Sequence, residues 1–374
     1  MSFFTYLKIL KRINFYILPP PKCSLLIYDK MSVQNGFVDI IFKNQKHVVL
    51  DVRYESINLY ILLLCILSFK FTNLKNTYKK IYIKTVDPKI VYTSIDNNPA
   101  FFNLKNLYSK PIYISDQNGV AKVETQSWPN NFSRYCKKFN QKSTKKLCAD
   151  LIFVFNNNEK RQMSKIIKGK VVALGNTKCN NFILNNIKKK KKEKKKIIFI
   201  NSGLYKETIS KEVEIFTYLK KYSEKKNLKL IMLSRRNKSA EDFYRKKFGV
   251  GNWIYQPKLD NLYSSYKTLS RSNNALIIFS HSTLGFEALA IGLKCIILLH
   301  NLAKKNTNWK DSDNGFFWSS KINYINISKI INKIFNCTQS NWEKNSKKIS
   351  NDYLMYDPGN VKKKLLIKKT TNKL

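Results

Sequence analysis

The sequence lacks an apolar run long enough to cross a membrane, and it has few of the residues that build metal sites or disulfide frameworks. Its richest apolar stretch, residues 57–69, is shorter than the roughly 18 residues that a spanning helix needs, and it predicts a buried helix instead. The three histidines are scattered, which indicates no metal cluster. The seven cysteines include no CxxC pair, and several lie in apolar runs, which is typical of reduced cysteine in a cytoplasmic protein.

Acidic residues are also scarce, because 24 Asp and Glu stand against 69 Lys and Arg, for a formal net charge of +45. Such a surplus favours polyanions, namely nucleic acid, an anionic membrane face or nucleotide substrates. An AT-rich coding bias toward Lys, Asn, Ile and Tyr explains the same surplus without a dedicated partner, and both interpretations stay open. The basic residues are dispersed, and zinc-finger or RNP-like signatures are missing, so we expect no specific nucleic acid. A basic nucleic-acid-binding protein is the alternative from another class.

What is present is a globular composition, 43% hydrophobic and 13% aromatic, in a chain of 374 residues that is long enough for two domains. Residues 188–196 are lysine throughout except Glu193, and like charges at that density resist packing. We therefore expect a linker there. The predicted order is a basic aromatic segment, an N-terminal domain, the lysine-rich linker, a C-terminal domain, and a final helix with a basic tail: 1–21, 22–184, 185–196, 197–340 and 341–374.

The first seventeen residues alternate aromatic and basic side chains, but they contain neither a long apolar core nor a small-residue cleavage site. This pattern does not fit a signal peptide and favours a basic amphipathic helix at a membrane surface. Together with the lysine-rich faces of the chain, it predicts a cytoplasmic protein that associates peripherally with the anionic inner face of the cytoplasmic membrane.

Apolar strand-like runs alternate with helical segments in both halves of the chain. Such alternation implies parallel strand pairing with right-handed crossovers. We therefore predict an α/β protein with two Rossmann-like doubly wound domains that face a central cleft. The expected strands lie near residues 22–28, 47–52, 89–94, 111–115, 150–155 and 170–174 in the first half and 197–201, 228–233, 253–255, 277–279 and 294–299 in the second.

Polar residues recur at the carboxyl ends of the predicted N-terminal strands, where open α/β sheets bind their ligands. This rule selects Glu55, Asp96 and Asn118. We expect Asp96 to act as a general base, with Glu55 as the second choice, because each is a carboxylate at a strand end that faces the cleft. Asn-Gly and Asp-Asn pairs also form ordinary turns, so a purely local role stays open for each position.

Residues 277–292 combine an apolar strand, small hydroxyl residues and an Ala/Leu-rich helix. The first turn of a helix leaves backbone N–H groups unpaired and carries partial positive charge, so Ser282, Thr283 and the small Gly285 predict a phosphate site. Glu287, one turn further, is placed to accept a sugar hydroxyl. The alternative is an ordinary strand-to-helix corner in which Ser282 or Thr283 only caps the helix.

Five motifs span residues from about 22 to 360, in this order: Arg53-Tyr54-Glu55-Ser56-Ile57-Asn58, Ile95-Asp96-Asn97, Gln117-Asn118-Gly119, Ser282-Thr283-Leu284-Gly285-Phe286-Glu287-Ala288-Leu289 and Gly315-Phe316-Phe317-Trp318. As a set they resemble the bacterial surface carbohydrate biosynthesis proteins, which assemble O-antigen or lipopolysaccharide. That family is similar to glycosyltransferases of the GT-B architecture. It is more distantly similar to polyol-phosphate transferases and nucleotide-sugar epimerases, which are the alternative functions on the same fold.

The resemblance implies that the C-terminal domain holds a nucleotide-sugar donor and the N-terminal domain a lipid-linked or saccharide acceptor. It assigns Ser282 and Thr283 to the diphosphate and Glu287 to the nucleotide ribose. Strand-end residues of the same domain complete the diphosphate site by topology: Ser202, Gly203 and Arg235.

Sugar transfer of this kind needs a base for the attacking hydroxyl and positive charge for the departing diphosphate. Helix N–H groups with Arg or Lys supply that charge, so we expect no metal and no cofactor besides the nucleotide-sugar substrate. Residues 311–313 match the DxD pattern of metal-dependent transferases, but they lie in a late polar loop, and we interpret the match as chance. We interpret His281 as a turn residue. A scaffold that kept the fold and lost activity is a further alternative.

Overall fold

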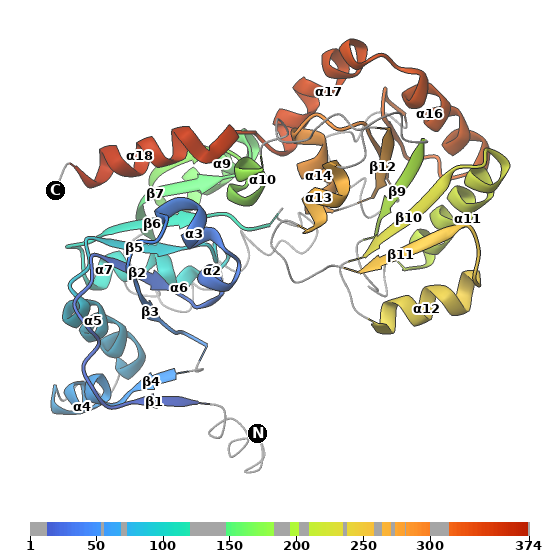
Figure 1. The fold of residues 1–374 in the computed structure, drawn as a ribbon. Coiled ribbons are helices and arrows are strands. Elements are labelled where there is room, and N and C mark those ends of the chain that lie inside the picture. The colour runs from blue at the N-terminus through green and yellow to red at the C-terminus, as the bar shows by residue number, and fades with distance from the viewer. Residues whose placement is uncertain are drawn as a thin grey trace. The chain divides into compact units, whose positions relative to one another are not determined.

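The computed structural model describes residues 13–53, 56–68, 73–119, 147–182, 195–201, 209–234, 238–257, 264–270, 274–280, 282–299 and 314–372. The chain forms two compact units (Figure 1). The first unit contains the described residues up to 118, residues 147–181 and residues 360–372, and the second contains Gly119 and the described residues from 182 to 359. Most of the predicted linker lies outside the described residues, and its last residue, Lys196, begins a strand of the second unit.

The first unit is built on a six-stranded parallel sheet in the order β3-β2-β5-β6-β7-β8, which confirms the predicted α/β class. The central strands β2, β5 and β6 are buried along their whole length, because short apolar runs in a parallel sheet are covered on both faces. The strands are β2 Leu25–Tyr28, β3 Val48–Leu50, β5 Ile90–Thr93, β6 Ile112–Asp116, β7 Cys148–Val154 and β8 Lys168–Ala173. The helices are α2 Met31–Gln34, α3 Phe37–Phe42, α5 Leu74–Val86, α6 Pro99–Phe102, α7 Leu104–Leu107, α9 Asn157–Ile166 and α10 Thr177–Asn181.

A small two-stranded parallel sheet, β1 (Asn14–Tyr16) with β4 (Ser56–Asn58), leads into helix α4 (Leu59–Leu67), which packs against α5 (Figure 1). The surface helix expected near the N-terminus is wrong for residues 14–16, because they pair with β4 as a strand; residues 1–12 lie outside the described part. The helix expected over 57–69 is present as α4, but the expectation that it is buried is wrong, because several leucines of α4 are exposed. Among the described helices, none is long and apolar enough to cross a membrane.

The second unit is built on a six-stranded parallel sheet in the order β11-β10-β9-β12-β13-β14. All strands run in the same direction, and the order in which the chain adds them to the sheet reverses between β9 and β12. Helix α11 presents Ile215, Phe216 and Leu219 to the core at three- and four-residue spacing. The strands are β9 Lys196–Ile200, β10 Lys229–Ser234, β11 Trp253–Pro257, β12 Ala275–Phe279, β13 Cys295–Leu298 and β14 Trp318–Ser319. The helices are α11 Ile209–Lys225, α12 Lys238–Phe248, α13 Ser264–Ser270, α14 Thr283–Ala290, α16 Tyr324–Asn336 and α17 Gln339–Tyr353.

The predicted basic tail is instead helix α18 (Val361–Thr371), which belongs to the first unit. A run of lysines in a sequence is expected to be exposed to solvent, but Lys363 is fully buried. It pairs with Asp116 at the end of β6, with 2.8 Å between Nζ and Oδ1. Lys363 also donates to the Thr177 hydroxyl at 2.6 Å, and that hydroxyl donates to the second Asp116 oxygen at 2.5 Å. Because a buried charge needs a partner, this network fixes α18 on the sheet.

Candidate functional site

The candidate ligand site of the second unit lies where its strand order reverses. The neighbouring strands β9 and β12 pair in parallel, and both end at the same edge of the sheet. In open α/β sheets, ligands bind beyond the carboxyl ends of the two strands at such a reversal. Asn201 follows β9, whereas Ser280 and Ser282 follow β12. The reversal therefore coincides with the stretch 277–292 that the sequence pattern selects.

In the turn between β12 and α14, the Ser282 hydroxyl does not cap the helix. Ser282 occupies the N-cap position with extended backbone, φ −144° and ψ 128°, and its side chain makes no capping hydrogen bond. The Phe286 N–H closes the first turn by donating to the Ser282 carbonyl at 3.1 Å. Upstream, the Ser280 hydroxyl donates to the Leu298 carbonyl at 2.5 Å, which ties the turn to β13. The geometry thus keeps the helix N-terminus and a nearby hydroxyl together, as an anion site requires.

Gly285 and Glu287 follow within the same helix. A Cβ on Gly285 would lie 2.3 Å from Cγ of Phe279, so the glycine lets α14 pack directly on the end of β12. Packing, rather than the approach of a phosphate, accounts for a glycine at this position. Glu287 is 5% exposed and so lies largely within the protein, one turn beyond the helix start.

Asn201 is a site residue that the sequence analysis missed. It is fully buried at the end of β9, and its Oδ1 atom has no hydrogen-bond partner among the described residues, while Nδ2 lies 3.8 Å from the sulfur of Met232. A buried unsatisfied carbonyl costs about 1–3 kcal/mol, which a donor group on a bound ligand would offset. The same strand-end rule that selected Asp96 would have found Asn201, because it follows β9 directly.

Several predicted residues lie outside the described part of the chain. One is Glu55, the second choice for the general base. The others are the three residues assigned to the diphosphate by topology, the turn histidine and the DxD match: Ser202, Gly203, Arg235, His281 and 311–313. Among the described residues, no group of three or more His, Cys, Asp or Glu is placed to hold a metal ion.

In the first unit, the structure brings two predicted residues together at the carboxyl ends of β5 and β6. Asp96 Oδ1 accepts a hydrogen bond from the Asn118 N–H at 3.3 Å, and Asp96 is 7% exposed. Burial raises the pKa of the Asp96 carboxyl well above its usual range. The Asn118 N–H opposes this rise, whereas the charges of Glu159 and Asp116 add to it. A carboxyl with a shifted pKa at a strand end suits a proton-transfer role.

Amide side chains support this edge of the sheet. Gln117 Oε1 accepts from the Phe155 N–H at 2.8 Å, and Asn176 Nδ2 donates to the Asn118 carbonyl at 3.3 Å. The neighbouring Asp116 differs from Asp96, because Lys363 neutralises it from α18. The geometry therefore separates two adjacent carboxyls into a structural partner of α18 and a group available for acid–base chemistry.

Known proteins resemble this chain in sequence and in fold. A family model described as "putative O-antigen biosynthesis protein" matches residues 117–371, which is more than half of the chain. No curated protein matches the chain.

Three solved structures resemble nearly the whole chain. The UDP-GlcNAc 2-epimerase from Neisseria meningitidis bound to UDP-GlcNAc has a TM-score of 0.53 at 14% identity, over 94% of this chain and 99% of that one. A glycosyltransferase from Rickettsia africae has a TM-score of 0.54 at 14% identity, over 94% and 99%. The wall teichoic acid polymerase TagF has a TM-score of 0.53 at 11% identity, over 96% and 90%.

At these identities the structural likeness establishes the fold and nothing further. Glycosyltransferases and UDP-GlcNAc 2-epimerases share that fold, so the predicted GT-B class is confirmed. Because the family model covers more than half of the sequence, the chain belongs to the O-antigen biosynthesis protein family.

Proposed function

We propose that this protein is a glycosyltransferase that moves a sugar from a nucleotide-sugar donor to a surface-polysaccharide acceptor of the O-antigen or lipopolysaccharide type. The observation that carries the proposal is the polar edge at the strand-order reversal of the second unit. There, the unpaired carbonyl oxygen of Asn201 and the non-capping hydroxyl of Ser282 lie at the ends of neighbouring strands. Membership of the family supports the acceptor class.

In the proposed complex, the donor diphosphate lies at the N-terminus of α14 against Ser282 and Thr283. The unpaired N–H groups of the first helical turn and the helix dipole stabilise its negative charge. Asn201 Oδ1 can only accept a hydrogen bond, so it pairs with a hydroxyl or N–H of the nucleoside or sugar. Glu287 accepts from the ribose. A structure of the same fold that is bound to UDP-GlcNAc supports a uridine nucleotide as the first donor to test.

For the chemical step, we propose that Asp96 removes the proton of the attacking acceptor hydroxyl. Its raised pKa makes the ionised carboxylate a stronger base than an ordinary aspartate, so this role needs a pH above that raised pKa. The departing diphosphate is stabilised by the α14 N-terminus and by basic side chains of the chain. We therefore propose transfer without a divalent metal or another cofactor.

Calorimetry on the full chain with UDP, UDP-GlcNAc and other nucleotide sugars tests the donor site. Ser282→Ala should weaken binding about tenfold, because a hydrogen bond to a charged group contributes about 1.5–3 kcal/mol. Glu287→Ala should weaken it by a similar factor through the ribose. Ser164→Ala, a serine on α9 of the first unit, is the matched control and should bind as the wild type does. If no nucleotide or nucleotide sugar produces heat, the donor assignment is wrong.

A nucleotide-sugar epimerase is the second candidate, because a UDP-GlcNAc 2-epimerase shares the fold over nearly the full chain. An epimerase converts the donor without an acceptor, whereas a transferase releases nucleotide diphosphate when an acceptor is present. Proton NMR of UDP-GlcNAc incubated with the protein alone distinguishes the two. New anomeric signals of an isomer would favour the epimerase. Nucleotide binding without either reaction would favour a scaffold that has lost activity.

A further inference from the structure

Exposed apolar side chains concentrate on one small part of the first unit. Of the 15 large apolar side chains exposed among the described residues, ten come from β1 and the residues just after it, from α4, and from the start of α5. The other five are scattered over both units. We call the ten the β1–α4 face: Phe15, Tyr16, Ile17, Leu18, Leu59, Tyr60, Leu63, Ile66, Leu67 and Leu74.

The β1–α4 face is held in a defined position. Helix α4 is apolar all round and buries only Ile61 and Cys65, while Leu63 is 53% and Leu67 59% exposed. The Asn58 side chain caps α4 by accepting from the Ile61 N–H at 3.0 Å and donates to the Leu18 carbonyl at 2.8 Å. One residue thus joins the β1 segment to the start of α4. A helix without a polar side is normally buried, so its exposure points to a partner.

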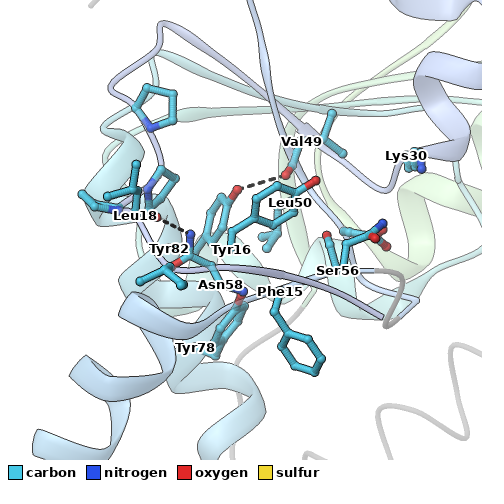
Figure 2. Close-up of a pocket in the computed structure, with 16 residues that line it drawn as sticks. Phe15, Tyr16, Leu18, Lys30, Val49, Leu50, Ser56, Asn58, Tyr78 and Tyr82 are labelled. Carbon is cyan, nitrogen blue, oxygen red and sulfur yellow. Dashed lines mark hydrogen bonds between the residues drawn. The ribbon is translucent and has the colours of Figure 1, made fainter. Parts of the chain in front are cut away.

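Behind this face lies a cavity of about 720 Å³, between the β1 segment and the edge strand β3 (Figure 2). Tyr16, Leu18, Leu50 and Tyr82 are among the side chains that line it. Tyr82 donates its hydroxyl to the Val49 carbonyl at 3.0 Å, so the tyrosine is fixed to β3. The β1 segment therefore stands off from the main sheet over an open cavity and does not bury its own apolar side chains there.

The sequence segments that build the face carry charge of one sign. The described residues 13–28, 56–68 and 73–86 contain no Asp or Glu and five lysines, of which Lys79 alone is buried: Lys22, Lys75, Lys79, Lys80 and Lys84. A second copy of this chain on the same face would bring like charges together, which opposes a symmetric dimer there. An anionic lipid surface, in contrast, offers negative charge to the lysines and acyl chains to the leucines.

We propose that the β1–α4 face inserts into the interfacial layer of an anionic lipid bilayer and binds the protein peripherally through its first unit. Leucines and isoleucines enter the apolar boundary, and the aromatic side chains Phe15, Tyr16 and Tyr60 lie at headgroup level, where amphipathic rings are favoured. The exposed lysines of α5, Lys75 and Lys84, contact anionic headgroups, whereas Lys79 is buried. Membrane binding by this surface needs neither the nucleotide-sugar donor nor the saccharide acceptor, so it is independent of the proposed sugar transfer.

Vesicle flotation of the full chain tests the proposal, with phosphatidylcholine vesicles that contain or lack one third phosphatidylglycerol. The wild type should float with anionic vesicles and dissociate as salt is raised. Attraction between each surface lysine and the anionic headgroups raises the partition coefficient roughly fivefold, and salt screens that attraction. The double substitution L63Q/L67Q should lower partitioning about 25-fold, or about fivefold for each half-exposed leucine. The matched control I325Q/L365Q replaces exposed apolar residues elsewhere and should leave partitioning unchanged.

Two further readouts keep the test decisive. Tyr60→Trp should shift its fluorescence to shorter wavelength when anionic vesicles are added; flotation without that shift would mean that another surface binds. Sedimentation velocity of the wild type and L63Q/L67Q reports self-association. If the wild type is a dimer that L63Q/L67Q disrupts, and neither floats with vesicles, the face is a protein interface and the proposal is overturned. Equal flotation of L63Q/L67Q and wild type would overturn it as well.

Discussion

Replacing Lys79 by methionine should make the protein more stable near neutral pH. Lys79 is 4% exposed on α5, and its Nζ donates to the Tyr28 hydroxyl at 3.0 Å. Burial, with a smaller contribution from the charge of Lys75, lowers the pKa of Lys79 from 10.5 to about 8. The folded state therefore holds a charged ammonium that it disfavours. Methionine fills a similar volume without that charge.

The size of the effect follows from the pKa. A folded-state value about 2.5 units below 10.5 corresponds to a penalty of about 3 kcal/mol at pH 7, where the group is protonated in both states. The lost hydrogen bond to Tyr28 costs about 1 kcal/mol, so Lys79→Met should raise the free energy of unfolding by about 2 kcal/mol. Between about pH 8 and pH 10.5 the unfolded chain binds more protons than the folded one, so this penalty disappears as pH rises.

Urea denaturation of wild type and Lys79→Met at pH 7 and pH 10 measures this difference. The gain at pH 7 should shrink at pH 10, because the wild-type ammonium is then neutral when folded. Lys80→Met, on the next residue of α5, is the matched control; Lys80 is only partly buried, so little change is expected. A variant that is less stable than wild type at both pH values, by the same amount, would refute the reasoning.

Three other substitutions test the site and the core. Asp96→Asn should lower the turnover rate at saturating substrate at least about 100-fold, and wild-type activity should rise with pH because the raised pKa must be passed before the base is free; near-normal turnover would exclude the role. Gly285→Ala should cost about 1–3 kcal/mol in urea denaturation, whereas Gly119→Ala, where a Cβ meets nothing within 4 Å, should cost much less. Lys363→Met should destabilise by about 3–5 kcal/mol, and adding Asp116→Asn should recover much of the loss if the ion pair is the cause.

Local pattern was sufficient to predict the two parallel sheets. Each strand of the six-stranded sheet in the first unit begins and ends within three residues of a predicted apolar run, because a strand covered on both faces must be apolar throughout. The strand-end rule also brought Asp96 and Asn118 together correctly. It applies wherever a parallel strand ends, so it would have selected Asn201 too.

The predictions that were wrong concern residues whose structural partners are distant in sequence. Lys363 looks like part of a solvated run until Asp116, 247 positions earlier, supplies its counter-charge. Helix α4 has the composition of a core helix, and only the three-dimensional arrangement of β1 and α5 decides that Leu63 and Leu67 are exposed. The first strand itself depends on pairing with residues 56–58, which no local periodicity in 14–16 signals.

The return of α18 to the first unit has a consequence for synthesis on the ribosome. Residues 182–359, which make up nearly all of the described part of the second unit, are translated before residue 360, whereas the first unit stays incomplete until Lys363 is made. Throughout the synthesis of the second unit the nascent chain therefore carries Asp116 without its cation, and the first unit cannot complete its fold until the last helix of the chain is made.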